Sequence, residues 1–260
     1  MTELALPLSG RRVLVTRTRE RAAGLVDRLH AAGASVAIVP LIATLPIADP
    51  EAIARVAAEV GTASPPRWVA FTSATAVRLV LGAVGADALA GVFVAAVAPA
   101  TAAALDAQGV AADLVASDHD AAGLAEAMLR QGVAGATVWF PVAEGARGGF
   151  AESLRAGGAF VTVQHIYRSV MPASAPGRLR AAFAAGVDAI TLTSGSTARN
   201  LVAAMGAGGL PVGAVIVCIG EQTAAEARAA GLTVQAVAEV ASVEGLVNAL
   251  TECLTPQRLR

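Results

Sequence analysis

Short runs of β-branched and other apolar residues alternate along the chain with longer segments in which apolar residues recur at helical spacing. RVLVT (12–16) precedes RAAGLVDRLHAAG (21–33), VFVAAV (92–97) precedes PATAAALDAQG (99–109), and VIVCIG (215–220) precedes EQTAAEARAAG (221–231). Each helical segment closes on a glycine, the residue that most often follows the end of a helix. This order of continuous apolar strands and helices is typical of a parallel sheet covered by helices, so we predict an α/β fold.

Two distant segments share one further pattern: an apolar strand, Thr-Ser, a loop of small residues and an arginine-bearing helix. They are WVAFTSATAVRLVL (68–81) and AITLTSGSTARNLV (189–202), in which Thr72 and Thr193 lie 121 positions apart. VFVAAVAPATAAALDAQG resembles VIVCIGEQTAAEARAAG at an offset of 122, and VLVTRTRERAAGLVDRLHAAGASV resembles VWFPVAEGARGGFAESLRAGGAFV at 125. Alanine-rich helices can resemble each other by chance, but composition alone does not fix the order of three blocks. The chain is therefore predicted to hold an internal duplication.

The length of 260 residues exceeds that of most small single domains and suits two domains of about 100 to 150 residues each. The third repeated block and its copy each end in an apolar strand, VAIVPLIATLPI (36–47) and VTVQHIYRSVMP (161–172). These two segments are where we expect the chain to cross between domains.

The hydropathy of the chain raises the question of a membrane, because 55% of its residues are hydrophobic and its mean hydropathy is +0.63. Alanine supplies much of this total, and aromatic residues make up only 3%. Proline and glycine interrupt the two longest uncharged runs, Ala88 to Leu105 and Asn200 to Gly220, whereas a spanning helix needs about 20 mostly apolar residues. The N-terminus also lacks the basic and then apolar order of a secretory signal. We expect a cytoplasmic protein with no membrane partner.

The basic residues are all arginine, 19 in number, and lysine is absent. This excludes Schiff-base chemistry, pyridoxal phosphate attachment and the phosphate-binding P-loop, each of which needs a lysine. A net charge of −1 without a dense arginine run argues against nucleic acid as a partner. Cys218 and Cys253 have no metal-site or disulfide spacing, and His30, His119 and His165 are scattered, so neither a metal nor another cofactor is expected.

Five short motifs follow one another along nearly the whole chain: VLVTR (13–17), FTSATAV (71–77), YRS (167–169), LTSGSTA (192–198) and CIGEQTAAEARAAG (218–231). Their order and spacing resemble those of the uroporphyrinogen-III synthase family, which closes a linear tetrapyrrole into a ring. The resemblance implies two similar flavodoxin-like α/β domains, each a parallel sheet flanked by helices, joined by a two-stranded connector with a cleft between. One domain, 1–42 with 168–260, would come from both chain ends, and the other, 43–167, would be inserted.

The sequence departs from the family pattern at two turns. Family members commonly carry glycine at the strand end that is Ala98 here, and arginine where this chain has Val142. The resemblance therefore gives no support for substrate contacts from these two turns.

The family substrate, hydroxymethylbilane, carries eight carboxylates and a hydroxymethyl leaving group. Helix N-termini offer free backbone N–H groups and a partial positive charge, so turns of small residues can bind carboxylates without lysine. The substrate-binding candidates are the hydroxyl residues of four such turns: Ser73, Thr75, Thr101, Ser194, Ser196 and Thr223. Helix capping alone is an open alternative for each, because it uses the same geometry. Arg17, at the end of the first strand, is a candidate carboxylate contact, with a surface salt bridge as the alternative.

Tyr167 is the only tyrosine, and it lies beside Arg168 where a domain crossing is expected. From the residues alone, a boundary residue with a packed ring and a solvated hydroxyl is an alternative to a catalytic role. The resemblance implies the latter, since the family's tyrosine is thought to assist departure of the substrate hydroxyl. A phenol is protonated at neutral pH and can donate a proton to a leaving hydroxide.

Water loss would give an azafulvene on ring A, which ring D attacks through its substituted carbon, and the resulting spiro intermediate rearranges with ring D inverted. Because this chemistry asks mainly for a correctly folded substrate, the resemblance implies an enzyme without a cofactor, expected to act as a monomer. Two other classes of protein are alternatives. A non-enzymatic binding protein for a small anionic ligand would show the same repeat. A nucleotide-dependent enzyme would need G-x-G-x-x-G after a strand, which is missing.

Overall fold

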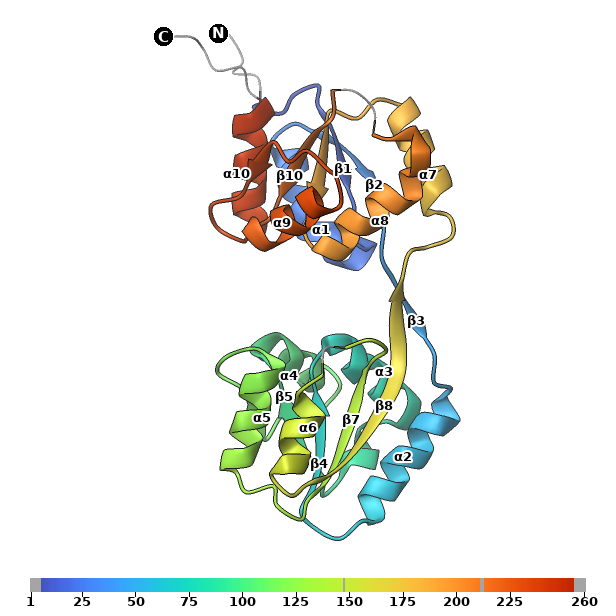
Figure 1. Ribbon diagram of the computed structural model, residues 1–260, viewed down its shortest axis with the longest axis vertical. Helices are drawn as coiled ribbons and strands as arrows, with labels where there is room; N and C mark the ends of the chain where they lie inside the picture. Colours follow the sequence, from blue (N-terminus) through green and yellow to red (C-terminus); the bar gives the residue numbers. More distant parts are fainter. Residues whose placement is uncertain (1–5, 147, 211–212, 255–260) are drawn as a thin grey trace. The chain divides into compact units, whose positions relative to one another are not determined.

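The computed structural model describes residues 6–146, 148–210 and 213–254 (Figure 1). The first five residues, part of the segment in which we expected no secretory signal, lie outside this range. The chain divides into two compact units: unit 1 is Met1–Ala43 with Val170–Arg260, and unit 2 is Thr44–Ser169. Whether they fold independently with the boundaries given above stays a prediction. None of the helices within the described ranges is long and apolar enough to cross a membrane.

Unit 1 is a five-stranded sheet, all of whose strand pairs are parallel, in the order β11-β10-β9-β1-β2. Its elements are β1 (Arg12–Val15), α1 (Arg19–Ala31), β2 (Ser35–Ile38), α7 (Ala175–Ala184), β9 (Ala189–Leu192), α8 (Gly195–Met205), a 3-10 turn (Gly206–Gly208), β10 (Val215–Cys218), α9 (Glu221–Ala229), β11 (Ala236–Val237) and α10 (Val243–Leu254). Helices cover both faces of this sheet, as its apolar strands predicted.

Side-chain alternation divides the core of unit 1 into two layers. Val13 and Val15 pack with the buried leucines of α1 and α10, whereas Leu14 between them packs with those of α7 and α8. Because successive side chains of a strand point to opposite faces, a strand buried on both sides is apolar throughout. This explains why RVLVT is a continuous apolar run rather than an alternating one.

Unit 2 is a six-stranded sheet in the order β3-β8-β7-β4-β5-β6. Its elements are β3 (Ala43–Pro46), α2 (Pro50–Thr62), β4 (Arg67–Phe71), α3 (Ala74–Val84), a 3-10 turn (Ala86–Leu89), β5 (Phe93–Ala96), α4 (Pro99–Asp106), β6 (Leu114–Val115), α5 (Ala121–Arg130), β7 (Thr137–Ala143), α6 (Phe150–Ala156) and β8 (Phe160–Val170). Helices α2, α3 and α4 cover one face of the sheet, and α5 and α6 cover the other. At β3 and β8 the chain passes between the two units (Figure 1).

The two sheets have one topology when their strands are matched by the sequence repeat. Strands β1, β2, β9, β10 and β11 of unit 1 correspond to β7, β8, β4, β5 and β6 of unit 2, and both sets occur in the same spatial order. That order is the flavodoxin-like 2-1-3-4-5 for unit 1, and unit 2 is its circular permutation with β3 added at one edge. The predicted duplication and fold class are confirmed. Each copy of the repeat is divided, with two strands in one unit and three in the other.

A half-buried glutamine connects three elements of unit 2. Gln164 of β8 accepts a hydrogen bond from the indole Nε1 of Trp139 in β7 at 3.0 Å. Its amide nitrogen donates to the carbonyl of Ala52 in α2, also at 3.0 Å. Trp139 is fully buried, so its indole N–H has no access to water in place of this partner.

Gln164→Leu is expected to lower the free energy of unfolding by about 1–3 kcal/mol, because it leaves the buried indole N–H without an acceptor. Urea denaturation followed by tryptophan fluorescence measures the change. Gln108→Leu, at an exposed position, is the control and should stay within about 0.5 kcal/mol of the parent. A Gln164→Leu variant as stable as this control would contradict the structural role of the glutamine.

Candidate functional site

Seven of the eight predicted site residues follow the carboxyl ends of parallel strands, and the eighth, Tyr167, lies within β8 opposite the end of β7. In unit 1, Arg17 follows β1, Ser194 and Ser196 follow β9, and Thr223 follows β10, which are three neighbouring strands. In unit 2, Ser73 and Thr75 follow β4, Thr101 follows β5, and Tyr167 lies opposite Ala143, the last residue of β7. The carboxyl ends of parallel strands lie at the same end of the sheet. The candidates of each unit therefore lie together at that end of its sheet.

Except for Thr101 and Thr223, which follow the next strand along, the candidates also lie beside the point where the strand order reverses. In unit 1 the chain proceeds outward from β1 to β2 and, in the other direction, from β9 to β11, so the reversal is between β1 and β9. In unit 2 it is between β7 and β4. Ligands of open α/β sheets bind outside the carboxyl ends at this point, because the flanking loops diverge there and leave a crevice.

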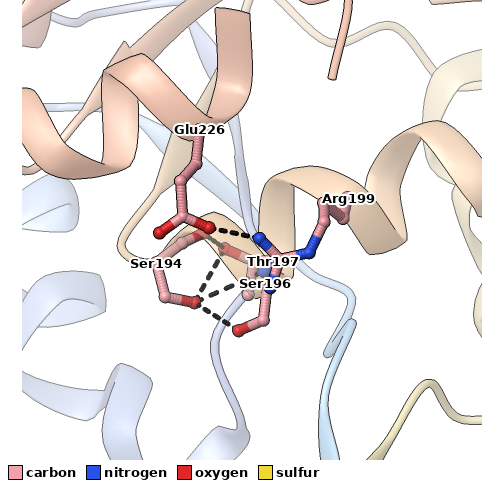
Figure 2. A network of polar contacts seen from close by, with 5 residues as sticks. All are labelled: Ser194, Ser196, Thr197, Arg199 and Glu226. Carbon is pink, nitrogen blue, oxygen red and sulfur yellow. Dashed lines mark hydrogen bonds and ion pairs between the residues drawn. The ribbon is translucent and has the colours of Figure 1, made fainter. Parts of the chain in front are cut away.

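In unit 1, the hydroxyl groups of the turn after β9 bond mainly to one another (Figure 2). Ser194 caps α8 by accepting the backbone N–H of Thr197 at 3.3 Å. Its Oγ also lies 3.0 Å from Ser196 Oγ and 3.3 Å from Thr197 Oγ1. The Thr197 hydroxyl donates to the carbonyl of Ser194 at 2.6 Å. Capping is therefore present at Ser194, while ligand contact by Ser194 and Ser196 stays a prediction.

An ion pair that the sequence did not indicate lies over the same turn. Arg199 of α8 pairs with Glu226 of α9, as Figure 2 shows. Glu226 closely approaches Gly195, where an added Cβ would overlap both its carboxylate and its Cβ. At the matching positions of unit 2 the repeat has Ala74 and Ala104, so this carboxylate belongs to one unit only.

Arg17 is a half-buried cation for which no hydrogen bond or ion pair occurs among the described residues. Burial lowers its pKa, and the nearby Arg21 guanidinium lowers it further. Both effects penalise the charged form, and an anion beside Arg17 would offset them. The surface salt bridge that we weighed for Arg17 is not found within the described chain.

In unit 2, the structure brings two sequence candidates into contact. Ser73 caps α3 by accepting the N–H of Ala76 at 3.1 Å. The same Oγ lies 2.9 Å from the phenolic oxygen of Tyr167, a residue 94 positions away in the chain. The Tyr167 ring packs against the core cluster that Ile166 also enters, although consecutive strand residues normally face opposite sides. A register shift opposite Ala143 accounts for this arrangement, since a β-bulge re-aims a side chain.

The three threonine candidates lie beneath their helix starts. Thr75, Thr101 and Thr223 are buried, and the Thr75 hydroxyl accepts a hydrogen bond from Arg78 at 3.3 Å. No side chain caps α4 or α9, which begin after Ala98 and Gly220. The start of α9 therefore has free backbone N–H groups to offer an anion. Helix α4 begins with Pro99, which has no N–H, and the Thr101 N–H donates to the Ala98 carbonyl at 2.9 Å, so only the N–H of Ala100 is left there.

The two departures from the family pattern have simple structural consequences. Ala98 has φ −164°, an extended conformation that any residue adopts, so alanine fits the strand end without strain. Val142 is buried within β7 in the core between the sheet, α5 and α6. This side chain is part of the packing and brings no charge to the edge.

No group of three or more His, Cys, Asp or Glu side chains in the described part of the chain could hold a metal ion. Cys218 is buried at the end of β10, and burial raises the pKa of its thiol to about 11. A thiol of this kind is protonated at neutral pH and is a poor nucleophile.

Comparisons with known proteins match this fold and this order of motifs. The family model described as uroporphyrinogen-III synthase HemD matches residues 9–248. The uroporphyrinogen-III synthase of Synechococcus elongatus is 30% identical over 259 residues, which cover 95% of this chain and 96% of that one. This chain belongs to the uroporphyrinogen-III synthase family. The resemblance drawn from the five motifs is thereby confirmed.

Solved structures of the uroporphyrinogen-III synthase family agree with the fold. The Helicobacter pylori enzyme matches with a TM-score of 0.64 at 14% identity, covering 93% of this chain and 99% of that one. A mutant of the Thermus thermophilus enzyme matches with a TM-score of 0.58 at 18% identity, covering 94% and 99%. At these identities the likeness supports the fold alone.

The close approach of Glu226 to Gly195 predicts that Gly195→Ala is destabilising, by about 1–3 kcal/mol, because α8 and α9 must move apart to admit the methyl group. The matched change in unit 2, Ala74→Gly, should cost less than about 1 kcal/mol, the ordinary helix propensity difference. Thermal unfolding of both variants makes the comparison. Equal costs at the two positions would show that Glu226 does not constrain the turn.

Proposed function

We propose that this chain is an enzyme that cyclises hydroxymethylbilane to uroporphyrinogen III, with loss of water and inversion of ring D, in haem biosynthesis. Family membership supports this reaction, because the family model spans residues 9–248 and the Synechococcus elongatus relative is similar along nearly its whole length. A non-enzymatic role in binding a small anionic ligand is not favoured, since it would leave the phenol at the sheet edge without a use.

One observation carries the chemical part of the proposal: the 2.9 Å contact between Ser73 Oγ and the hydroxyl of Tyr167. It holds the only phenol of the chain at the edge where α/β sheets bind ligands. Tyr167 is half-buried, and its side chain packs against the core of unit 2, which holds the ring in place. These are the requirements for a positioned general acid.

Tyr167 donates its proton to the hydroxyl of the substrate's hydroxymethyl group. The C–O bond breaks, its electron pair leaves with oxygen, and water departs. The carbon left on ring A is the electrophilic end of a protonated azafulvene. Ring D attacks it through its substituted carbon, and the spiro intermediate rearranges so that ring D is inverted. The closed macrocycle loses one proton, which returns to the phenolate of Tyr167, and the enzyme recovers its starting state.

The turns of the two units bind the carboxylates of the substrate. Arg17 supplies a cation without a resident partner, and the uncapped start of α9 supplies free N–H groups. Hydroxyl contacts come from Thr75, Thr101, Ser194, Ser196 and Thr223, whereas the hydroxyl of Ser73, the remaining candidate, lies 2.9 Å from that of Tyr167. Holding a flexible tetrapyrrole in one conformer is an orientation effect, so the reaction needs no cofactor. We infer that the enzyme acts as a cytoplasmic monomer.

The purified chain is expected to convert hydroxymethylbilane into the type III isomer without added metal, nucleotide or other cofactor. The substrate is generated enzymatically, and the products are oxidised and separated by chromatography. Heat-denatured protein is the control and should give only the type I isomer, which forms spontaneously. Type I product alone from folded protein would refute the proposed function.

Tyr167→Phe keeps the ring and removes the hydroxyl, so it separates proton donation from packing. Turnover to type III is expected to fall by roughly 10²-fold, the usual scale of a general acid. Affinity for the product should change much less, because the product lacks the leaving group. Initial rates and product titration measure the two quantities. A variant with turnover within about twofold of the parent would return Tyr167 to a packing role.

A further inference from the structure

We propose that Ser73 is a positioning residue that acts through Tyr167: it fixes the direction of the phenolic O–H and stabilises the phenolate once the proton has left. The inference rests on the proposed function, in which Tyr167 is the proton donor. It assigns to Ser73 a role in the proton-transfer step, separate from any contact with substrate carboxylates.

The Ser73 hydroxyl can donate to the phenol while it caps α3, and this direction of the bond is the one that serves the proposed reaction. A serine hydroxyl has one donor and two acceptor positions, and the backbone N–H of Ala76 occupies one acceptor at 3.1 Å. When the Ser73 hydroxyl donates to the phenolic oxygen at 2.9 Å, the proton of Tyr167 is left free to point at the substrate. When that proton has been transferred, the phenolate can only accept, and the same Ser73 hydrogen bond continues to serve it.

The charge distribution around Ser73 favours this polarity. A hydroxyl that already accepts a hydrogen bond becomes a better donor, because linked hydrogen bonds polarise one another. Ser73 also stands at the N-terminus of α3, an 11-residue helix whose backbone places partial positive charge at that end. Negative charge that develops on Tyr167 is therefore stabilised by a group that is in place before the reaction begins, as electrostatic preorganisation requires.

The duplicated turn of unit 1 shows how Ser73 comes to be available. There the matching Ser194 has its hydroxyl within hydrogen-bond distance of Ser196 and Thr197. The repeat replaces these two residues by Thr75, whose hydroxyl instead accepts from Arg78, and by Ala76, which has no hydroxyl. Ser73 thus has no hydroxyl partner on its own turn.

The partner of Ser73 is likewise present in one copy only. At the offset of 125 that relates the third pair of repeated blocks, Ile42 takes the place of Tyr167. Ser73 and its counterpart Ser194 are the same residue type but have different neighbours, whereas Tyr167 and its counterpart Ile42 are different residue types. In the unit 1 turn the hydroxyl of Ser194 contacts other hydroxyls of the same turn, whereas in the unit 2 turn the hydroxyl of Ser73 contacts the phenol of Tyr167.

The kinetic test uses Ser73→Gly, which removes the hydroxyl yet costs the helix cap only a few tenths of a kcal/mol. We expect kcat to fall about 10-fold, the value of one neutral hydrogen bond, and KM to change less than about twofold. In the Tyr167→Phe background, Ser73→Gly should cause no further fall in kcat, because its effect passes through the phenol. Ser73→Thr keeps a hydroxyl and should restore most of the activity.

A second measurement needs no substrate. Tyrosine labelled with ¹³C at Cζ gives a single resonance in this chain, since Tyr167 is the only tyrosine. We expect that resonance to shift in Ser73→Gly and to return toward the parent value in Ser73→Thr. Ser194→Gly removes the matching cap in unit 1, where no tyrosine is present, and should leave the resonance in place.

The outcomes separate this inference from the proposed function. If Tyr167→Phe lowers kcat but Ser73→Gly does not, Tyr167 acts without Ser73 and the positioning role is wrong. If Ser73→Gly lowers kcat equally in the parent and Tyr167→Phe backgrounds, Ser73 acts on the substrate directly, and the positioning role is again wrong. An unchanged ¹³C resonance in Ser73→Gly would show that the contact is absent in solution. An inactive parent enzyme would instead refute the proposed function, and a fully active Tyr167→Phe would refute the role of Tyr167 as proton donor on which this inference rests.

Discussion

The parallel pairing of strands is the constraint on which the rest of this structure depends. Two parallel neighbours cannot be joined by a tight turn, so each connection crosses a face of the sheet, here as a helix. The helices following β4 and β9 therefore begin at the carboxyl edge, with their unpaired N–H groups and partial positive charge directed outward. Such N–H groups can bind an anion without any lysine.

The same constraint explains why serine and threonine recur at the edge. The turn between a strand and its helix is short, and a hydroxyl there can satisfy one of the orphan N–H groups, as Ser73 and Ser194 do. Threonines one turn further along face inward and are buried, as Thr101 and Thr223 are. In both cases the local structure of the helix start already accounts for the residue. Ligand contact at these positions has to be compatible with it, which is why a capping hydroxyl such as Ser73 can take a second partner.

Much of the fold could be predicted from the sequence, because its signals are local. Strands buried on both faces are continuous apolar runs, helices close on glycine, and the repeat fixed which turns are equivalent. The residues at the edge were also foreseeable, since each lies a few positions after such a run. What could not be predicted depends on register and on distant packing. The contact between Ser73 and Tyr167 requires a bulge in β8 that no residue pattern signals. The closeness of Glu226 to Gly195 depends on the spacing of two helices, although a glycine where the repeat has Ala74 was a visible hint.

Each sheet is completed by strands from both copies of the repeat, and this has a consequence for the half-length chain. A polypeptide of one copy would hold two strands of one sheet and three of the other, so it could close neither core alone. Two such polypeptides would complete both sheets by exchanging their ends, as domain-swapped dimers do. In the present protein both copies are in one chain, and each sheet contains strands from both copies, as each half of a domain-swapped homodimer would. Because the two copies are joined in one chain they need not be identical, and this chain has Tyr167 in one copy and Ile42 at the matching offset in the other.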